Sequence, residues 1–217
     1  MNEKNIRNKH LVVLLVLNFM LIFLINEISK LIFGNIAIDN GQDAFEKTST
    51  IILLLPWLIG PLKEELKYRW ILGQFSYNAT IGSLSILLSD LILTITLKTL
   101  VDKTVLYFNY YFFLLTLSLL FFLVLKRFQN SFEFTLYKLF SKFYKFIYLG
   151  SILIFALWHT LLNDYNQSTP IITMLVIYII NGFIISYIRI QLGLLQAIVY
   201  HYLYNLPFMI PFIIYYL

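Results

Sequence analysis

A succession of long apolar runs constrains the fold of this 217-residue chain more than any other feature of its sequence. Several runs approach the roughly 20 residues that a helix needs to cross a bilayer. Hydrophobic side chains make up 60% of the sequence and charged ones 12%, against roughly 45–50% and about 25% in soluble proteins. Because the runs are continuous, without the alternation of a β-barrel strand, we predict membrane-spanning helices. The expected fold is an all-α, polytopic helical bundle.

The runs predict seven to eight transmembrane helices in a single integral membrane domain that comprises residues 1–217. We expect spans at about 11–28, 50–74, 81–97, 105–125, 147–162, 171–188 and 192–206. Pro207 opens a short apolar tail at 208–217, which is too short to cross a membrane unless it extends an earlier element. Lys4, Arg7 and Lys9 precede the first span and place the N-terminus in the cytoplasm. This first run lacks a small-residue cleavage site and is followed by more spans, so we interpret it as a retained helix and not as a signal peptide.

The basic residues lie mainly at the ends of apolar runs. The formal net charge of +5 therefore indicates membrane topology, and we expect no nucleic-acid partner. Around residues 131–145, lysines alternate with phenylalanines, which predicts an interfacial amphipathic helix; anionic lipid is the expected partner of residues 126–145. The chain has no cysteine, which excludes disulfides, thiolate catalysis and cysteine-ligated metals. A composition rich in Ile, Phe, Asn and Lys favours a bacterial cell membrane.

Polar groups inside the predicted spans are the candidates for function, because an ionisable side chain at membrane depth costs roughly 2.5–3.5 kcal/mol on insertion scales. These groups are Glu64, Glu65, Arg69, Asp90, His159, Asn163, Asn181, His201 and Asn205. We expect interhelical hydrogen bonds at Asp90 and Asn181. Glu65 and Arg69, four residues apart, are spaced for an ion pair within one helix. A wet interfacial loop is the alternative for this segment, because Lys63 and Lys67 flank its acidic residues.

Two carboxylates, two imidazoles and an amide are the groups needed to activate a water molecule and to stabilise an oxyanion. A single buried histidine is more often a packing residue, and Asn205 could simply satisfy backbone groups before Pro207. The occurrence of all these groups in predicted spans favours a catalytic site.

Three motifs among these residues resemble those of the CPBP family, which contains type II CAAX prenyl endopeptidases and bacteriocin-processing or self-immunity proteins. The family motifs are Glu-Glu-x-x-x-Arg, Phe-x-x-x-His and His-x-x-x-Asn, and they occur here in that order. Their residues in this chain are Glu64, Glu65, Arg69, Phe155, His159, His201 and Asn205. The similarity covers about residues 50–210. The chain departs from the family in having Trp70 in place of a small residue and an additional helix pair at about 81–125.

The resemblance implies a role for each motif residue. Glu64 would be the general base that takes a proton from the attacking water, and His159 would position or polarise that water. His201 and Asn205 would stabilise the tetrahedral oxyanion. Glu65, paired with Arg69, would hold the motif helix in place, with Phe155 as further structural support.

The implied function is that of an intramembrane endopeptidase acting on a peptide or protein substrate at the membrane. The alternative is a bacteriocin self-immunity protein that binds a membrane target without catalysis. A transporter is disfavoured because the sequence shows no inverted repeat. A glutamate and two histidines would also suit a catalytic zinc ion, but the resemblance to glutamate-type endopeptidases favours chemistry without a metal or other cofactor. The sequence leaves the oligomeric state and the cleavage site open.

Overall fold

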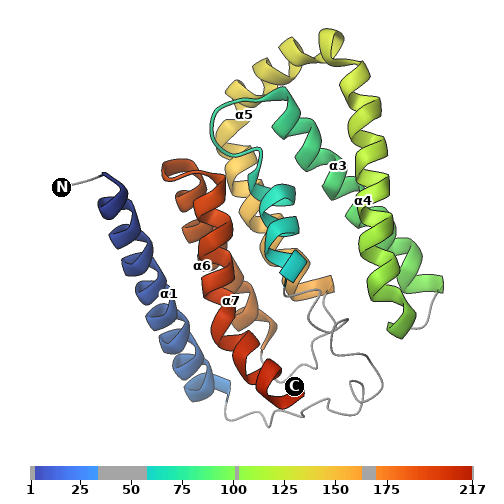
Figure 1. Ribbon diagram of the computed structural model, residues 1–217. Coiled ribbons are helices and arrows are strands. Elements are labelled where there is room, and N and C mark those ends of the chain that lie inside the picture. Colours follow the sequence, from blue (N-terminus) through green and yellow to red (C-terminus); the bar gives the residue numbers. More distant parts are fainter. Residues whose placement is uncertain (1–2, 34–57, 101–102, 163–169, 217) are drawn as a thin grey trace. The chain divides into compact units, whose positions relative to one another are not determined.

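The computed structural model describes residues 3–33, 58–100, 103–162 and 170–216 (Figure 1). All regular structure in these ranges is helical, as the apolar runs predict. Residues 58–64 form a helix that continues directly into a π-helical turn, η2. The elements are α1 (Glu3–Phe33), η2 (Glu65–Arg69), α3 (Tyr77–Leu100), α4 (Lys103–Arg127), α5 (Gln129–Leu157), a second π-helical turn η3 (Trp158–Leu162), α6 (Ile171–Gln191) and α7 (Leu194–Tyr216).

Four segments of the described chain are long and apolar enough to cross a membrane: Tyr77–Thr96, Tyr110–Arg127, Gln129–Thr160 and Ile171–Gln191. Helix α1 contributes a shorter apolar stretch, Leu11–Ile25. The chain therefore has the character of a membrane protein, and the larger number of seven to eight spans stays a prediction. The first part of the expected span at 50–74 lies outside the described residues.

Contacts between residues divide the chain into two compact units. The first unit comprises Met1–Lys47 and Leu149–Pro207, and the second comprises Thr48–Tyr148 and Phe208–Leu217. The first unit thus contains α1, the end of α5, η3, α6 and most of α7. The second contains η2, α3, α4 and the first part of α5.

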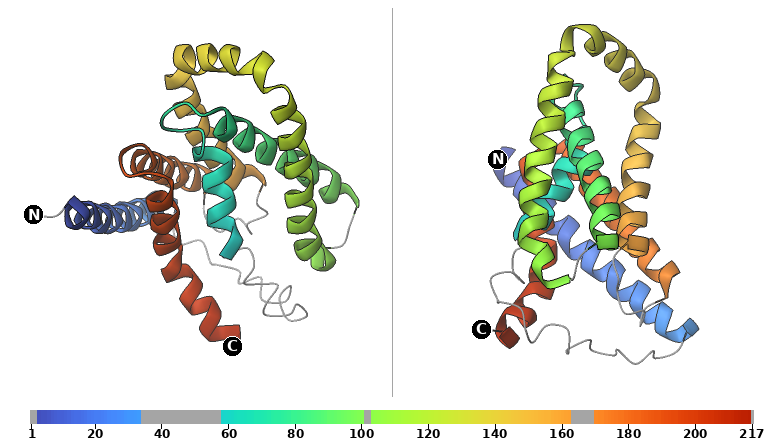
Figure 2. Two further views of the ribbon diagram at one scale, coloured as in Figure 1. Left: turned by 45° about the horizontal axis from the view of Figure 1, so that its top comes forward. Right: turned by 90° about the vertical axis from the view of Figure 1, so that its right-hand side faces the viewer.

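In the second unit, α3 and α4 form a hairpin of helices that lie side by side (Figures 1 and 2). The start of α3 lies beside the end of α4: the Tyr77 hydroxyl donates a hydrogen bond to the carbonyl of Leu125 at 2.7 Å, and Lys126 donates one to the Asn78 side chain at 2.7 Å. This hairpin lies where the sequence predicts a pair of helices, at about residues 81–125. Both helices extend a few residues beyond the predicted apolar spans.

Residues 131–145 and 147–157, expected as an interfacial helix and part of a separate span, belong to one continuous helix, α5. The helix bends at Phe143, where φ is −112° and ψ is 16°. No proline lies between Gln129 and Leu157 to end the helix, which is why the two expected elements merge. An interfacial position for residues 131–145 stays a prediction.

In the first unit, α6 and α7 are joined by a tight connection. The backbone N–H groups of Leu192 and Gly193 both donate to the carbonyl of Ile188, at 2.8 and 3.2 Å. Gly193 adopts a φ of +106°, a conformation that favours glycine because it has no Cβ. The connection brings Ile188 against Ala197 and Tyr200 in a buried cluster.

Helix α7 continues through Pro207 to Tyr216, so the apolar tail extends the last expected span and is not a separate element. Proline cannot donate to the carbonyl four residues earlier, yet apolar membrane helices tolerate it when neighbouring groups satisfy the backbone. Pro207 and Pro211 each remove one backbone donor from α7, and the apolar residues around them still favour a continuous helix.

Candidate functional site

The first motif lies in the second unit on the segment 58–69, whose final turn is η2. Glu65 and Arg69 are both buried, at 0% and 1% exposure. The Arg69 guanidinium donates from Nη1 to Glu65 Oε1 at 2.7 Å. Glu65 and Arg69 therefore form the ion pair within one helix that their four-residue spacing suggested. Because both charges are buried, each depends on the other for compensation.

Helix α3 contacts this π-helical turn and the residue that follows it. The hydroxyl of Ser83 donates to the backbone carbonyl of Leu66 at 2.8 Å, so a carbonyl of the turn gains a partner outside its own helix. One residue earlier, Gly82 has the ring of Trp70 packed directly against its Cα. The close approach of the Trp70 ring is possible because Gly82 has no side chain.

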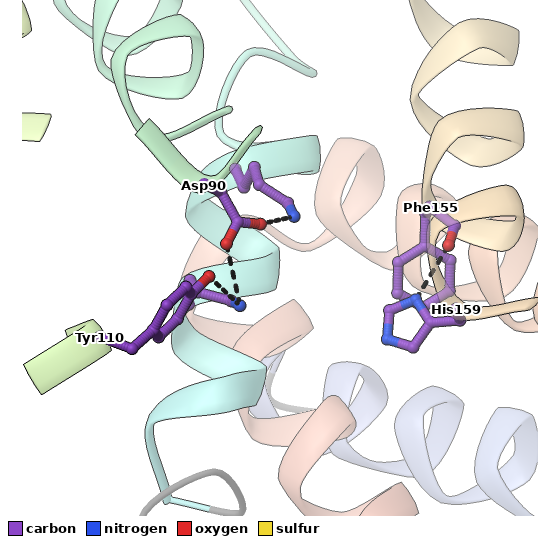
Figure 3. A network of polar contacts seen from close by, with 6 residues as sticks. Asp90, Tyr110, Phe155 and His159 are labelled. Atoms are coloured by element: carbon purple, nitrogen blue, oxygen red, sulfur yellow. Dashed lines mark hydrogen bonds and ion pairs between the residues drawn. The ribbon is translucent and has the colours of Figure 1, made fainter. Parts of the chain in front are cut away.

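A polar cluster that was not predicted joins the first motif to α3 and α4. It consists of Lys63, Lys67, Asp90 and Tyr110, of which Figure 3 labels Asp90 and Tyr110. Lys67 and Asp90 form an ion pair at 3% and 0% exposure. Lys63 Nζ lies 3.5 Å from the other oxygen of Asp90 and 3.5 Å from the Tyr110 hydroxyl. Burial of Lys67 argues against a wet loop here. The interhelical hydrogen bond expected at Asp90 is therefore present, with Lys67 as its donor. The sequence did not indicate that the partner would be a lysine of the first motif.

The second motif lies in the first unit, where α5 ends and η3 begins. The rings of Phe155 and His159 have centroids 4.4 Å apart, and His159 Nδ1 lies 2.8 Å from the Phe155 carbonyl oxygen (Figure 3). A carbonyl can only accept a hydrogen bond, so Nδ1 carries the hydrogen. In the neutral imidazole, Nε2 of His159 then bears the lone pair and can accept a proton or a hydrogen bond from water.

The third motif lies on α7 in the same unit. The ring of His201 is buried and stands edge-on to Phe155, with centroids 6.4 Å apart. Tyr178 of α6 lies against the other imidazole, 4.8 Å from His159 between centroids. The first unit therefore gathers both imidazoles around one phenylalanine ring. Asn205 is half-buried one helical turn after His201.

A second polar network fixes α7 beside α1 and α6. The Asn18 amide donates to the Asn181 side chain and to the Tyr200 hydroxyl, the latter at 3.0 Å. The Asn181 amide donates to the Tyr204 hydroxyl at 2.7 Å. The interhelical hydrogen bonds expected for Asn181 are therefore present. Asn18 was missed, although an asparagine within an apolar run is itself a signal of such bonding.

The groups of the expected site are thus distributed over both units. Glu64 is half-buried in the second unit, whereas His159, His201 and Asn205 belong to the first. Their convergence stays a prediction. Within either unit, the described residues contain no group of three histidine, aspartate or glutamate side chains arranged to hold a metal ion. Asn163 lies outside the described residues.

Comparison with known proteins adds no relative: no protein-family model, curated protein or solved structure matches the chain.

Proposed function

We propose that the chain is an intramembrane endopeptidase of the CPBP type, which hydrolyses a peptide bond with water activated by a glutamate. The observation that carries the proposal is the position of the π-helical turns. The described chain contains two, and each coincides with a motif: η2 holds Glu65 and Arg69, and η3 holds His159. Such turns account for well under 1% of residues in proteins and occur frequently at functional sites. The motifs were identified from residue spacing, so the helix geometry is an independent observation.

The hydrogen bond from His159 Nδ1 to the Phe155 carbonyl leaves Nε2 as the ring nitrogen that can accept a hydrogen bond from water, which suits the proposed chemistry. In the mechanism we propose, Glu64 takes a proton from water while Nε2 of His159 accepts a hydrogen bond from the same molecule. The oxygen then attacks the peptide carbonyl, and His201 and Asn205 donate hydrogen bonds to the oxyanion that forms. When the carbon–nitrogen bond breaks, the proton held by Glu64 passes to the leaving amine.

The buried ion pair of Glu65 and Arg69 supports a division of labour between the adjacent glutamates. Glu65 is engaged by the guanidinium within its own helix and is completely buried. Glu64 is half-buried, and the proposed role requires its carboxylate to be reached by water and substrate. We therefore assign the proton transfer to Glu64 and a supporting role to Glu65. The proposed substrate is a membrane-associated or secreted peptide precursor, and the proposed location is a bacterial cell membrane.

Peptide hydrolysis by the purified protein tests the proposal. The detergent-solubilised chain is incubated with a peptide library, and new termini are identified by mass spectrometry. We expect cleavage by the wild type and its loss in Glu64→Gln and in His201→Ala. Glu133→Gln and His10→Ala are matched controls outside the motifs and should retain cleavage; Glu133 is exposed on α5.

Adding a metal chelator to the same assay tests whether cleavage requires a metal ion. Retained cleavage in the presence of chelator supports the proposed direct action of Glu64 on water. Loss with chelator and recovery with zinc would assign Glu64 and the two histidines to a metal site instead. If cells expressing Glu64→Gln remain protected against a bacteriocin and no peptide is cut, the proposal is wrong and a binding role in immunity replaces it.

A further inference from the structure

Glu64 lies between two cationic residues on the motif helix, Lys63 directly before it and Lys67 three residues after it. Side chains three residues apart are neighbours on a helix surface. Accordingly, the charge of Glu64 lies within electrostatic reach of Lys67 and Tyr68. The ammonium of Lys67 also lies over the Tyr68 ring, 4.2 Å from its centroid. Since Lys67 is buried, its charge is poorly screened by water and acts strongly on its surroundings.

The compensating charge comes from the additional helix pair. Asp90 of α3 accepts a hydrogen bond from Lys67 through one oxygen, and its other oxygen lies 3.5 Å from Lys63 Nζ. Helix α4 contributes Tyr110, whose hydroxyl lies 3.5 Å from Lys63 Nζ. One carboxylate therefore holds both ammonium groups that flank Glu64 in sequence (Figure 3).

We propose that Asp90 is a positioning residue that sets the electrostatic potential at Glu64 by holding Lys63 and Lys67. This inference rests on the proposed function of Glu64. Without the carboxylate of Asp90, two ammonium charges beside Glu64 would lack their partner on α3. They would stabilise the negative charge of Glu64 and make it a poorer acceptor for the proton of water. The additional helix pair then contributes to the site as well as to the fold.

In the described part of this unit, the charged groups beside Glu64 come from the motif helix and α3. The motif helix itself supplies the two lysines and the Glu65–Arg69 pair, whose opposite charges offset each other. Helix α3, which packs against η2, supplies Asp90. Removal of the Asp90 charge should therefore make the potential at Glu64 more positive, and removal of the Lys67 charge should make it more negative.

Thiol chemistry measures this potential without reference to activity. The chain has no cysteine, so Glu64→Cys introduces a single thiol. Its rate of reaction is measured with an anionic, a cationic and a neutral methanethiosulfonate reagent, the neutral one correcting for access. We expect Asp90→Asn to raise the ratio of anionic to cationic rates about fivefold, and Lys67→Gln to lower it by a similar factor, as expected for one unit charge a few ångströms away. A cysteine at Glu133, on the exposed side of α5, is the control and should show no change.

Opposite shifts from the two substitutions are the outcome that a purely structural role cannot produce, because loosened packing would change access to all three reagents. An unchanged ratio in Asp90→Asn overturns the inference. If Asp90→Asn does not fold, Asp90→Glu retains the charge and should leave the ratio unchanged, while Lys67→Gln must still lower it; failure of either expectation overturns the inference.

Cleavage kinetics test the role of Asp90 separately from the proposed protease activity. Asp90→Asn should reduce kcat about tenfold with little change in KM, and Asp90→Glu should restore it. If Asp90→Asn changes neither kcat nor the reagent ratio, while Glu64→Gln still abolishes cleavage, the proposed role of Asp90 is refuted and the proposed protease activity is not. Absence of cleavage by the wild type refutes the protease, whereas the reagent ratio still decides whether Asp90 controls the potential at position 64.

Discussion

Replacement of Gly82 by alanine tests whether α3 packs on the first motif as closely as the structure shows. A methyl group at this position would come within 3.0 Å of three atoms of the Trp70 ring. Trp70 directly follows Arg69 and is half-buried, so the ring must move or α3 must retreat from η2. The substitution therefore probes the contact that accommodates tryptophan beside the buried Glu65–Arg69 pair.

The expected change in the free energy of unfolding follows from two opposing effects. Overpacking of a filled interior costs about 1–3 kcal/mol, whereas a glycine-to-alanine change within a helix gains about 1 kcal/mol from backbone preference. Gly150 on α5 isolates the second term, because a methyl group added there has no neighbouring atom within 4 Å. We expect Gly150→Ala to be stabilising by about 1 kcal/mol and Gly82→Ala to be neutral to destabilising by about 2 kcal/mol.

The assay is reversible unfolding of both variants in mixed micelles, with the difference between them as the measured quantity. Trp70→Leu should relieve the overlap, so the double variant with Gly82→Ala should be more stable than the sum of the two single effects. Equal stability of Gly82→Ala and Gly150→Ala, or strictly additive effects in the Trp70→Leu background, would refute the close packing of α3 against η2.

The buried polar pairs give two further predictions. Glu65→Gln should destabilise the protein by about 3–5 kcal/mol because it removes the carboxylate that is paired with the buried Arg69 charge, while the double change Glu65→Leu and Arg69→Met should cost much less. Unfolding measurements on the single and the double variant check this, and an equal loss in both would contradict it. Asn18→Leu and Asn181→Leu should each cost about 1 kcal/mol through lost interhelical hydrogen bonds, with non-additive effects in the double variant. Additive losses there would show that the two asparagines act independently.

The positions of most described helices could be predicted from apolar runs alone. The predicted spans 81–97, 105–125 and 171–188 fall inside α3, α4 and α6, because a continuous apolar run of this length can satisfy its backbone in lipid only as a helix. The residues at which helices begin and end were less predictable. Helix α5 joins two expected elements, since nothing in its sequence forces a break, and α7 continues through Pro207.

The motif residues were predictable from spacing, but their surroundings were not. A four-residue spacing such as Glu65 to Arg69 is compatible with an ordinary α-helix, so nothing in the sequence indicated a π-helical turn. An interhelical hydrogen bond was expected at Asp90, but the sequence could not show that Lys67 would be its donor, because it does not show which helix packs beside the motif. The fit of Trp70 against Gly82 is of the same kind: it joins residues on two elements and follows from their packing, not from local preference.

The proposed mechanism requires the three motifs to form one site. Cross-linking of position 64 to the histidine positions of the other unit tests this requirement most directly. Because the chain has no cysteine, Glu64→Cys can be paired with His201→Cys or with His159→Cys in an otherwise thiol-free protein. A methanethiosulfonate cross-linker a few ångströms long should join both pairs. Leu62→Cys with His201→Cys is the matched control: Leu62 is exposed and, two residues before Glu64, points from another side of the same helix, so it should not react. Absence of the Glu64 cross-links, or equal cross-linking by Leu62, would contradict the proposed site.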